Sequence, residues 1–317
     1  MMKKLLQSLL FVLLLMLCPF TASAGNFCGD TNCDGNVNIS DVTTLIDYLL
    51  GSDLDTFSVT NADTNRDGNV SIADVTTLID MLLGGYVPQT FTVGGVSFTM
   101  VPVEGGTFTM GATAEQGSDF SSNERPVHQV TLSGYFIGET EVTQALWQAV
   151  MGSNPSWYTG NLQRPVECVS WNDSQTFITK LNQLTGKTFR LPTEAEWEFA
   201  ARGGTRSQGY KYAGSNTIGE VAWYSGNSSS TTHVVATKYP NELGLYDMSG
   251  NVMEWCQDLY GSYTSNAQTN PAGPVSGSYR VYRGGSWCNS ARLCRVSYRN
   301  FSDPSLTSYS LGLRLAL

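Results

Sequence analysis

The chain has 317 residues with 27 acidic and 18 basic side chains, which gives a formal net charge of −9. Ten aspartates and a single arginine lie within residues 26–85, so the acidity is concentrated near the N-terminus and the rest of the chain is close to neutral. Because the chain has no basic surface that could displace counterions from phosphates, we expect no nucleic-acid partner.

Residues 1–24 have the pattern of a secretion signal. Lys3 and Lys4 precede an apolar run from Leu5 to Leu17, and residues 22–24, Ala-Ser-Ala, supply the small side chains of a cleavage site. No other segment reaches the roughly 18 consecutive apolar residues of a membrane span. We therefore expect an exported protein that is secreted or held at the cell surface through a partner.

A duplicated loop follows. Residues 30–51 and 63–84 match at 18 of 22 positions, and each stretch opens with a twelve-residue segment, DTNCDGNVNISD or DTNRDGNVSIAD. Oxygen donors stand at loop positions 1, 3, 5 and 12, a glycine at position 6 allows a sharp turn, and position 7 offers its backbone carbonyl, which is the pattern of a calcium loop. The predicted ligands are Asp30, Asn32, Asp34, Asn36 and Asp41 in the first loop and Asp63, Asn65, Asp67, Asn69 and Asp74 in the second.

Each loop leads into an apolar stripe at helical spacing, beginning at Val42 and at Val75, which predicts one exit helix per loop. No amphipathic helix precedes either loop, position 12 is Asp instead of Glu, and the copies start 33 residues apart. In these features residues 26–85 resemble the type I dockerin, a small all-α module of bacterial surface assemblies, including those that degrade polysaccharides. The resemblance implies calcium-dependent docking to a cohesin-type receptor.

The cysteines suggest crosslinks in an oxidising compartment. Cys28 and Cys33 lie at the first loop, whereas Asn61 and Arg66 stand at the same positions of the second copy. Because the two cysteines occur together, we predict a disulfide between them. The second half of the chain holds four more, which allow three connectivities: Cys168, Cys256, Cys288 and Cys294.

Residues 86–90 are expected to form a linker, and residues 91–317 are long enough for one compact domain with a substantial core. This region is rich in Gly, Ser, Asn, Trp and Tyr, so most of it is expected to form short strands and ordered loops. Thr193 ahead of Glu196 resembles a capping box at a helix start. Apolar spacing and such start signals predict helices over residues 143–151, 173–184 and 193–202.

Several sequence blocks in this domain carry a family resemblance. They are MVPVEGGTFTMG from Met100, ETEVTQALWQAVMG from Glu139, RPVECVSWNDSQTF from Arg164, FRLPTEAEWEFAARGG from Phe189, GLYDMSGNVMEWCQD from Gly244, and RVYRGGSW with LGLRLA near the C-terminus. In this order and spacing they resemble the formylglycine-generating enzyme, or sulfatase-modifying factor, family. The resemblance implies an α+β domain, a variant of the C-type lectin fold that is low in regular secondary structure.

The family's oxidase binds copper(I) through two cysteines that follow the GGS turn and are separated by four residues; thiolates suit that soft ion. Here Cys288 and Cys294 are separated by five. Counted from Ser286, which matches the family's active-site serine, Cys294 is in place and Cys288 is one residue early. Either the turn absorbs the extra residue and restores the pair, or Asn289 takes the first ligand position and the copper site is lost. In the second case Cys294 is expected to form a disulfide or to pack as a buried thiol.

The family's second calcium site maps onto DMSGNVMEW. The resemblance implies ligands from the side chains of Asp247 and Glu254 and from the carbonyls of Gly250 and Val252; the alternative is that Glu254 pairs with a core arginine. The family's other calcium site would fall near residues 223–229, where the carboxylate is missing. An iron site with three histidines is excluded, because His128 and His233 are the only histidines of the chain.

The remaining charged and aromatic residues of the blocks are interpreted as structural. Three glutamates near Arg190 are expected to form a buried polar network, since no nucleophile accompanies them: Glu194, Glu196 and Glu198. Four arginines are expected to hold loops by hydrogen bonds: Arg283, Arg295, Arg299 and Arg314. Four tryptophans are expected in the core: Trp171, Trp197, Trp255 and Trp287.

Together these patterns predict an exported protein with a calcium-folded docking module and a sulfatase-modifying-factor-like domain. That domain is expected to bind or display a protein or glycan ligand, because residues 286–310 are dense in Ser, Asn, Tyr and Arg, a composition suited to adaptable contacts. The alternative is a copper-dependent oxidase that converts a cysteine of an exported sulfatase to formylglycine.

Overall fold

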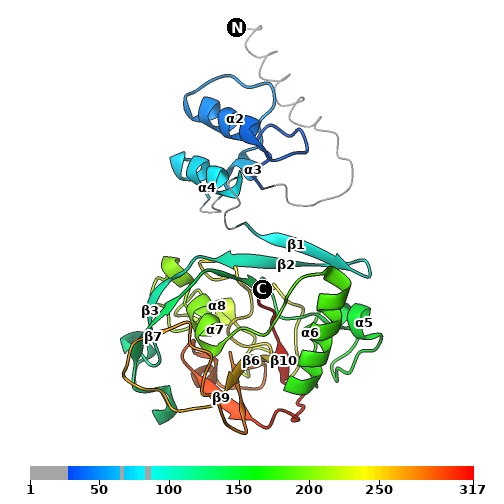
Figure 1. Cartoon of the computed structure of the whole chain (residues 1–317), viewed down its shortest axis with the longest axis vertical. Helices are drawn as coiled ribbons and strands as arrows, with labels where there is room; N and C mark the ends of the chain where they lie inside the picture. Colours follow the sequence, from blue (N-terminus) through cyan, green and yellow to red (C-terminus); the bar gives the residue numbers. More distant parts are fainter. Residues whose placement is uncertain (1–27, 65–67, 83–86) are drawn as a thin grey trace. The chain divides into compact units, whose positions relative to one another are not determined.

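The computed structural model describes residues 28–64, 68–82 and 87–317 (Figure 1). The predicted secretion signal and two of the predicted calcium ligands, Asn65 and Asp67, lie outside the described residues. The chain divides into two compact units, residues 1–85 and 86–317, and each is described by itself.

The N-terminal unit is built from the two predicted exit helices, α2 (Ile39–Leu49) and α4 (Ile72–Leu82). Helix α2 begins with a capping box, in which Asn38 and Asp41 bond each other's backbone amides. A one-turn helix that the sequence did not predict, α3 (Val59–Ala62), lies ahead of the second loop. The apolar sides of the helices meet in a small core that consists of Val42, Leu45, Ala62, Val75 and Leu78.

The C-terminal unit contains three small sheets. The first has the order β1-β2-β5, with β1 (Gln89–Val93), β2 (Val96–Val103) and β5 (Tyr135–Gly138). The second has the order β3-β4-β7, with β3 (Gly106–Met110), β4 (His128–Leu132) and β7 (Gln268–Thr269). The third has the order β10-β6-β8-β9, with β10 (Leu311–Leu313), β6 (Met253–Leu259), β8 (Arg280–Arg283) and β9 (Arg299–Ser302).

Strand β1 begins inside the segment that was predicted as a linker. Gln89 already pairs with Met100 of β2, so the ordered sheet extends two residues ahead of the expected domain start. Sequence patterns place such boundaries only to within a few residues, because a strand of five residues carries little periodic signal.

The three predicted helices are confirmed as α5 (Gln144–Met151), α6 (Trp171–Thr185) and α7 (Glu194–Ala201). Thr143 and Thr193 are the N-caps of α5 and α7, and the capping box of Thr193 with Glu196 is present. The other short turns are α8 (Ile218–Val221) and the 3-10 turns η1 (Ala114–Gln116), η2 (Ser122–Glu124), η3 (Gly204–Arg206) and η4 (Ala291–Cys294).

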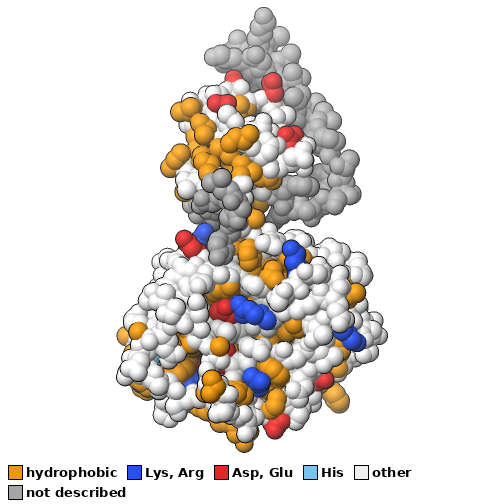
Figure 2. Space-filling model, viewed as in Figure 1, with side chains coloured by type: hydrophobic (Ala, Val, Ile, Leu, Met, Phe, Trp, Pro, Cys, Tyr) orange, Lys and Arg blue, Asp and Glu red, His pale blue; other side chains and the backbone are white. Residues whose placement is uncertain are grey.

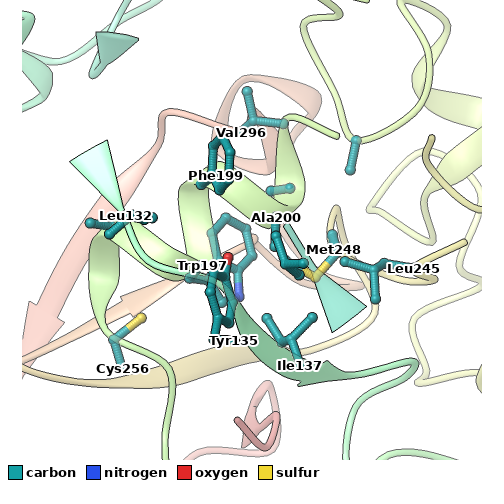
Figure 3. Close-up of a cluster of buried hydrophobic side chains, with 14 of the residues drawn as sticks. Leu132, Tyr135, Ile137, Trp197, Phe199, Ala200, Leu245, Met248, Cys256 and Val296 are labelled. Carbon is teal, nitrogen blue, oxygen red and sulfur yellow. The ribbon is translucent and has the colours of Figure 1, made fainter. Parts of the chain in front are cut away.

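Helix α7 runs through the centre of the larger core. Figure 3 shows Trp197 and Phe199 of this helix among side chains from β5 and from the loop that holds Leu245 and Met248. A second cluster packs α5 and α6 against β1, β2 and β10, and the rings of Trp147 and Phe177 stack within it at 4.8 Å. The prediction of buried tryptophans is confirmed for Trp197, Trp255 and Trp287, whereas Trp171 is only half-buried.

Buried ion pairs surround α7, and they confirm the predicted polar network for Glu194 and Glu198, whereas Glu196 pairs with the partly exposed Arg190 at 2.6 Å. Arg299 pairs with Glu194 at 2.7 Å, Arg295 pairs with Glu124 at 2.7 Å, and the completely buried Arg283 pairs with Glu198. Arg283 also donates to the carbonyls of residues 297 and 298. Because a buried charge is costly unless it is paired and hydrogen-bonded, these arginines fix the backbone before and after the GGSW segment.

Candidate functional site

The first predicted calcium loop folds around its own carboxylates. The two oxygens of Asp30 accept from the amides of Asp34 and Gly35 at 3.0 Å, and Asp34 in turn accepts from the amide of Asn36 at 2.8 Å. Asp41 is buried and accepts from the amide of Asn32 at 3.2 Å, which joins loop positions 3 and 12. Gly35 has φ of 85°, a left-handed conformation that favours glycine at position 6.

The second loop repeats the same contacts. Asp63 accepts from the amide of Gly68 at 3.0 Å, as Asp30 does from Gly35, and Asp74 accepts from the amide of Ser71 at 2.8 Å. Within the described residues, no three acidic, histidine or cysteine side chains converge closely enough to hold an ion. The hard oxygen donors fit calcium in kind, and the full ligand sets, including the carbonyls of Asn36 and Asn69, stay a prediction.

The GGSW turn places Ser286 between two possible partners. Its hydroxyl is buried, donates to Asn289 Oδ1 at 2.9 Å and lies 3.3 Å from Cys288 Sγ. Asn289 and Cys288, the two candidates for the family's first copper-ligand position, therefore both contact the serine. The thiol of Cys288 is exposed to solvent.

Cys294 lies in a different environment from Cys288. Its side chain is completely buried below the turn, and a side-chain carbon added to Gly285 would lie only 2.7 Å from its sulfur. Burial raises the pKa of the Cys294 thiol to about 12, although a hydrogen bond from the Ser286 backbone opposes this change. Of the two states expected for Cys294 if the copper site is lost, a disulfide or a buried thiol, the structure shows the buried thiol. The loss of the copper site itself stays a prediction.

The expected disulfides of this domain are absent from the structure, since its cysteines are all thiols: Cys168, Cys256, Cys288 and Cys294. Cys256 and Cys294 are each buried within separate hydrophobic clusters, which accounts for their lack of a bridge. In the N-terminal unit the thiol of Cys28 donates to the carbonyl of Thr64 at 3.8 Å. Its bridge to Cys33 stays a prediction.

Aromatic side chains cover the surface next to Cys288. The edge of Tyr158 packs on Trp287 with ring centroids 5.2 Å apart, and Tyr309 lies 5.7 Å from the same indole, whose Nε1 donates to the Tyr309 carbonyl. Trp157 is 75% exposed and Tyr309 is 51% exposed. We call Tyr158, Trp287 and Tyr309 the aromatic face. Sequence reasoning missed the exposed Tyr309 and Trp157, because no periodic pattern distinguishes an aromatic residue of a surface loop from one in the core.

Comparisons with known proteins identify both units. Residues 94–317 match the sulfatase-modifying factor enzyme 1-like domain, and residues 28–83 match the dockerin type I domain. The chain belongs to the sulfatase-modifying factor family. A type I dockerin implies calcium binding, a cohesin partner and an extracellular or cell-surface assembly. No described helix is long and apolar enough to cross a membrane.

The relatives of the sulfatase-modifying factor domain carry different names. The chain is 34% identical over 271 residues to the chaperone protein LppX of Paenibacillus barcinonensis, covering 69% of this chain and 89% of that protein. It is 32% identical over 283 residues to the formylglycine-generating enzyme of Streptomyces coelicolor, covering 68% and 88%. Among solved structures, Treponema denticola variable protein 1 is 40% identical, with a TM-score of 0.66 over 73% of this chain and 98% of that one. The fold is therefore the α+β, C-type-lectin-like fold of this family, and family membership alone assigns no single activity.

The predicted calcium site of the sulfatase-modifying factor domain is only partly arranged for an ion. Arg314 bonds both oxygens of Glu254, at 2.7 to 3.1 Å, and Trp197 Nε1 donates to the same carboxylate at 2.6 Å. Glu254 thus forms the arginine pair that the sequence left as the alternative. Asp247, in contrast, has one oxygen bonded by the Ala236 amide and one buried oxygen, Oδ1, without a partner. Burial raises the pKa of Asp247 to about 6.

A third carboxylate, which sequence reasoning missed, lies beside this pair. Glu141 is buried and accepts from the amide of Val252 at 2.9 Å and from the side chain of Asn251 at 2.7 Å. Burial and the charges of Asp247 and Glu254 raise its pKa well above the ordinary range. The mutual repulsion of Glu141, Asp247 and Glu254 favours a proton on one of them, and within the described residues the three do not converge on one ion position. The Oδ1 of Asp247 without a hydrogen-bond partner is the kind of oxygen that calcium binds. The coordination by Asp247, Gly250, Val252 and Glu254 stays a prediction.

Proposed function

We propose that this is an exported protein that docks through its dockerin to a cohesin-type receptor and uses its sulfatase-modifying-factor domain as a binding or display module. Calcium bound in the two dockerin loops stabilises the fold of the docking unit. The ligand of the second domain is a protein or a glycan bound at the aromatic face. The protein is secreted or surface-associated under this proposal, in line with the charged and apolar pattern of residues 1–24.

Exposed apolar side chains on the dockerin helices support the docking role. Ile39 and Ile72, the first residues of α2 and α4, are 73% and 71% exposed, and Ile46 and Ile79 are 36% and 38% exposed. Figure 2 shows apolar side chains gathered over this small unit. Because equivalent residues of the two copies are equally exposed, the unit presents two related faces, and either one can serve the same receptor.

The environment of Cys294 is the observation that carries the binding role. A copper(I) pair needs two thiolates that reach one ion. The thiol of Cys294 is sealed below the backbone of Gly285 and resists ionisation, whereas Cys288 is exposed and Asn289 bonds the family's serine. The adjoining surface instead presents exposed rings, which are suited to ligand contact.

The oxidase remains the second candidate, and the 3.3 Å approach of Cys288 Sγ to Ser286 Oγ is the observation that favours it. In that case the two cysteines bind copper(I), and the chain oxidises a cysteine of an exported sulfatase. Copper as a bound group would supply the oxygen chemistry, and Ser286 would orient the neighbouring sulfur.

A copper and turnover experiment separates the two candidates. The purified full chain is incubated with copper(I), and copper per chain and oxygen uptake with a cysteine peptide of the sulfatase type are measured. We expect neither stoichiometric copper nor oxygen uptake. Oxygen uptake that Cys294→Ser abolishes, and that the control Cys168→Ser leaves intact, would overturn the binding role and establish the oxidase.

A further inference from the structure

A cleft opens in the sulfatase-modifying factor domain where strand β5 leaves strand β2. Strand β5 pairs with β2 only over residues 100–103, whereas residues 96–99 of β2 have β1 on one side and no described strand on the other. The cleft has a volume of about 200 Å³ and lies between residues 97–99 and residues 138–143. None of its lining residues belongs to the aromatic face.

The open edge of β2 presents backbone groups on the side of this cleft. The carbonyl of Thr99 accepts from the amide of Glu139 at 2.9 Å, so Thr99 directs its backbone groups to the side of β5. Because every second residue of a strand directs its backbone groups to the same side, Ser97 does so too. Within residues 87–317, no other group bonds the amide or the carbonyl of Ser97 on that side. An open strand edge of this kind can pair with an extended peptide.

An unpaired carboxylate also lines the cleft. Glu139 is half-buried, and its position opposite Thr99 puts both side chains on the same face of the sheet, which is also the face of Ser97. The ion pairs of the described residues all engage other carboxylates. Of the described residues that line the cleft, none is basic. The cleft therefore favours a cation over an anion or a neutral group.

The second carboxylate of the cleft is already engaged. Glu141 is buried, and its two oxygens accept from the amide of Val252 at 2.9 Å and from the side chain of Asn251 at 2.7 Å. Glu139 is thus the carboxylate that is available to a ligand.

We propose that this cleft binds an extended segment of a partner protein that carries a lysine or an arginine. The segment continues the line of β5 and pairs with Ser97, so its basic residue lies two positions beyond Glu139 on the same face. Two residues along a strand span about 7 Å, a distance that a lysine or arginine side chain covers. Val142 and Leu315 also line the cleft and suit the apolar stem of such a side chain. The inference concerns a second site and does not rest on the ligand of the aromatic face.

Two pentapeptides of equal shape test this inference. Ac-Thr-Val-Lys-Val-Thr-NH2 and the same peptide with norleucine, which lacks the charge, in place of lysine are titrated against the full chain. Dissociation constants are measured by NMR. We expect the lysine peptide to bind at least about threefold more tightly, a factor within the range of a partly exposed ion pair. Equal affinities, or no binding of the lysine peptide, would overturn the inference.

Variants locate the charge. Glu139→Gln keeps the shape of the side chain and the backbone bond to Thr99, and it is expected to remove the preference for lysine over norleucine. Glu104→Gln is the matched control, because Glu104 is exposed directly after β2 and does not line the cleft. A preference that persists in Glu139→Gln, or that is lost in Glu104→Gln, would overturn the inference.

Methylated peptides test the strand pairing with the unchanged protein, so they decide even if Glu139→Gln fails to fold. Methylation of the lysine amide nitrogen removes the donor to the Ser97 carbonyl and is expected to weaken binding at least about threefold. Methylation of the next valine is the control, because the amide of that residue points away from β2. Equal weakening by both changes, or by neither, would overturn the inference. Binding of n-butylamine as tight as that of the lysine peptide would also overturn it, because the cleft would then be a site for a small amine.

Discussion

Replacing Arg314 with methionine tests whether Glu254 is an ion-pair partner or a metal ligand. Arg314 is completely buried, bonds Glu254 at 2.7 Å and donates to the carbonyls of Gly138 and Tyr246 at 2.8 and 2.7 Å. Methionine keeps most of the apolar stem but leaves Glu254 as an uncompensated buried charge. Removal of one partner of a buried pair costs about 3–5 kcal/mol.

This loss is measurable by calorimetry. For a domain of this size, each kcal/mol lowers the melting temperature by about 2–4 °C, so the transition of residues 86–317 should fall by about 6–20 °C in chelator. Arg292→Met is the control, because that exposed guanidinium reaches only Asp119 and Ser121 and is expected to cost about 1 kcal/mol or less.

The effect of calcium on the stability of Arg314→Met tests whether Glu254 can also act as a metal ligand. Without the guanidinium, Glu254 and the free oxygen of Asp247 are both available to an ion, so calcium should restore part of the lost stability of Arg314→Met. A loss below about 1 kcal/mol in chelator would refute the reasoning, since it would mean that the observed pair contributes little.

Three further predictions concern the dockerin and one buried carboxyl group. Because the loop carboxylates repel one another without a metal, chelator should lower the helical circular dichroism of the dockerin and calcium should restore it. The double variant Asp34→Ala with Asp67→Ala should abolish this response. An intact response in that variant would show that the ions bind elsewhere. Ile39→Asp or Ile72→Asp alone should leave calcium-dependent cohesin binding measurable by titration, whereas the double variant should lose it; complete loss in either single variant would contradict two equivalent faces. Burial and the charge of Glu194 raise the pKa of Asp258 to about 8, so its contribution to stability is present below pH 3.8 and lost as the pH rises to 8. Between pH 3.8 and 8 the free energy of unfolding of Asp258→Asn should therefore rise relative to that of the wild type by at least about 1 kcal/mol in denaturant titrations. A difference that does not change with pH would refute the raised pKa of Asp258.

The sequence predicted those parts of the fold that depend on local signals. The capping box of Thr193 and Glu196 predicted the start of α7, and the apolar stripes after the duplicated loops predicted α2 and α4. The one-turn helix α3 was not predicted, because four residues show no helical periodicity and Ser58 alone is a weak N-cap signal. The early start of β1 escaped for the same reason.

The candidate site was predicted less completely, since its geometry depends on contacts between distant segments. Glu141 and Asp247 are more than 100 residues apart in sequence, and only the folded loop around Asn251 brings their carboxylates together. The offset of Cys288 was visible in the sequence. The effect of this offset on the two thiols could not be predicted, because the turn could have absorbed the extra residue. The structure shows that Cys288 is exposed and that Cys294 is buried.

The contrast between buried support and exposed rings around the GGSW segment agrees with the proposed binding role. Arg283, directly before the turn, is completely buried and anchored by Glu198 and by two backbone carbonyls. The exposed rings of Trp157 and Tyr309 make no comparable contribution to the core. Substitutions at the face therefore cost little folding stability, whereas substitutions behind the turn cost several kcal/mol. A rigid support below replaceable contact residues can change its ligand without losing its fold, and a catalytic centre, whose reacting groups must keep their geometry, cannot.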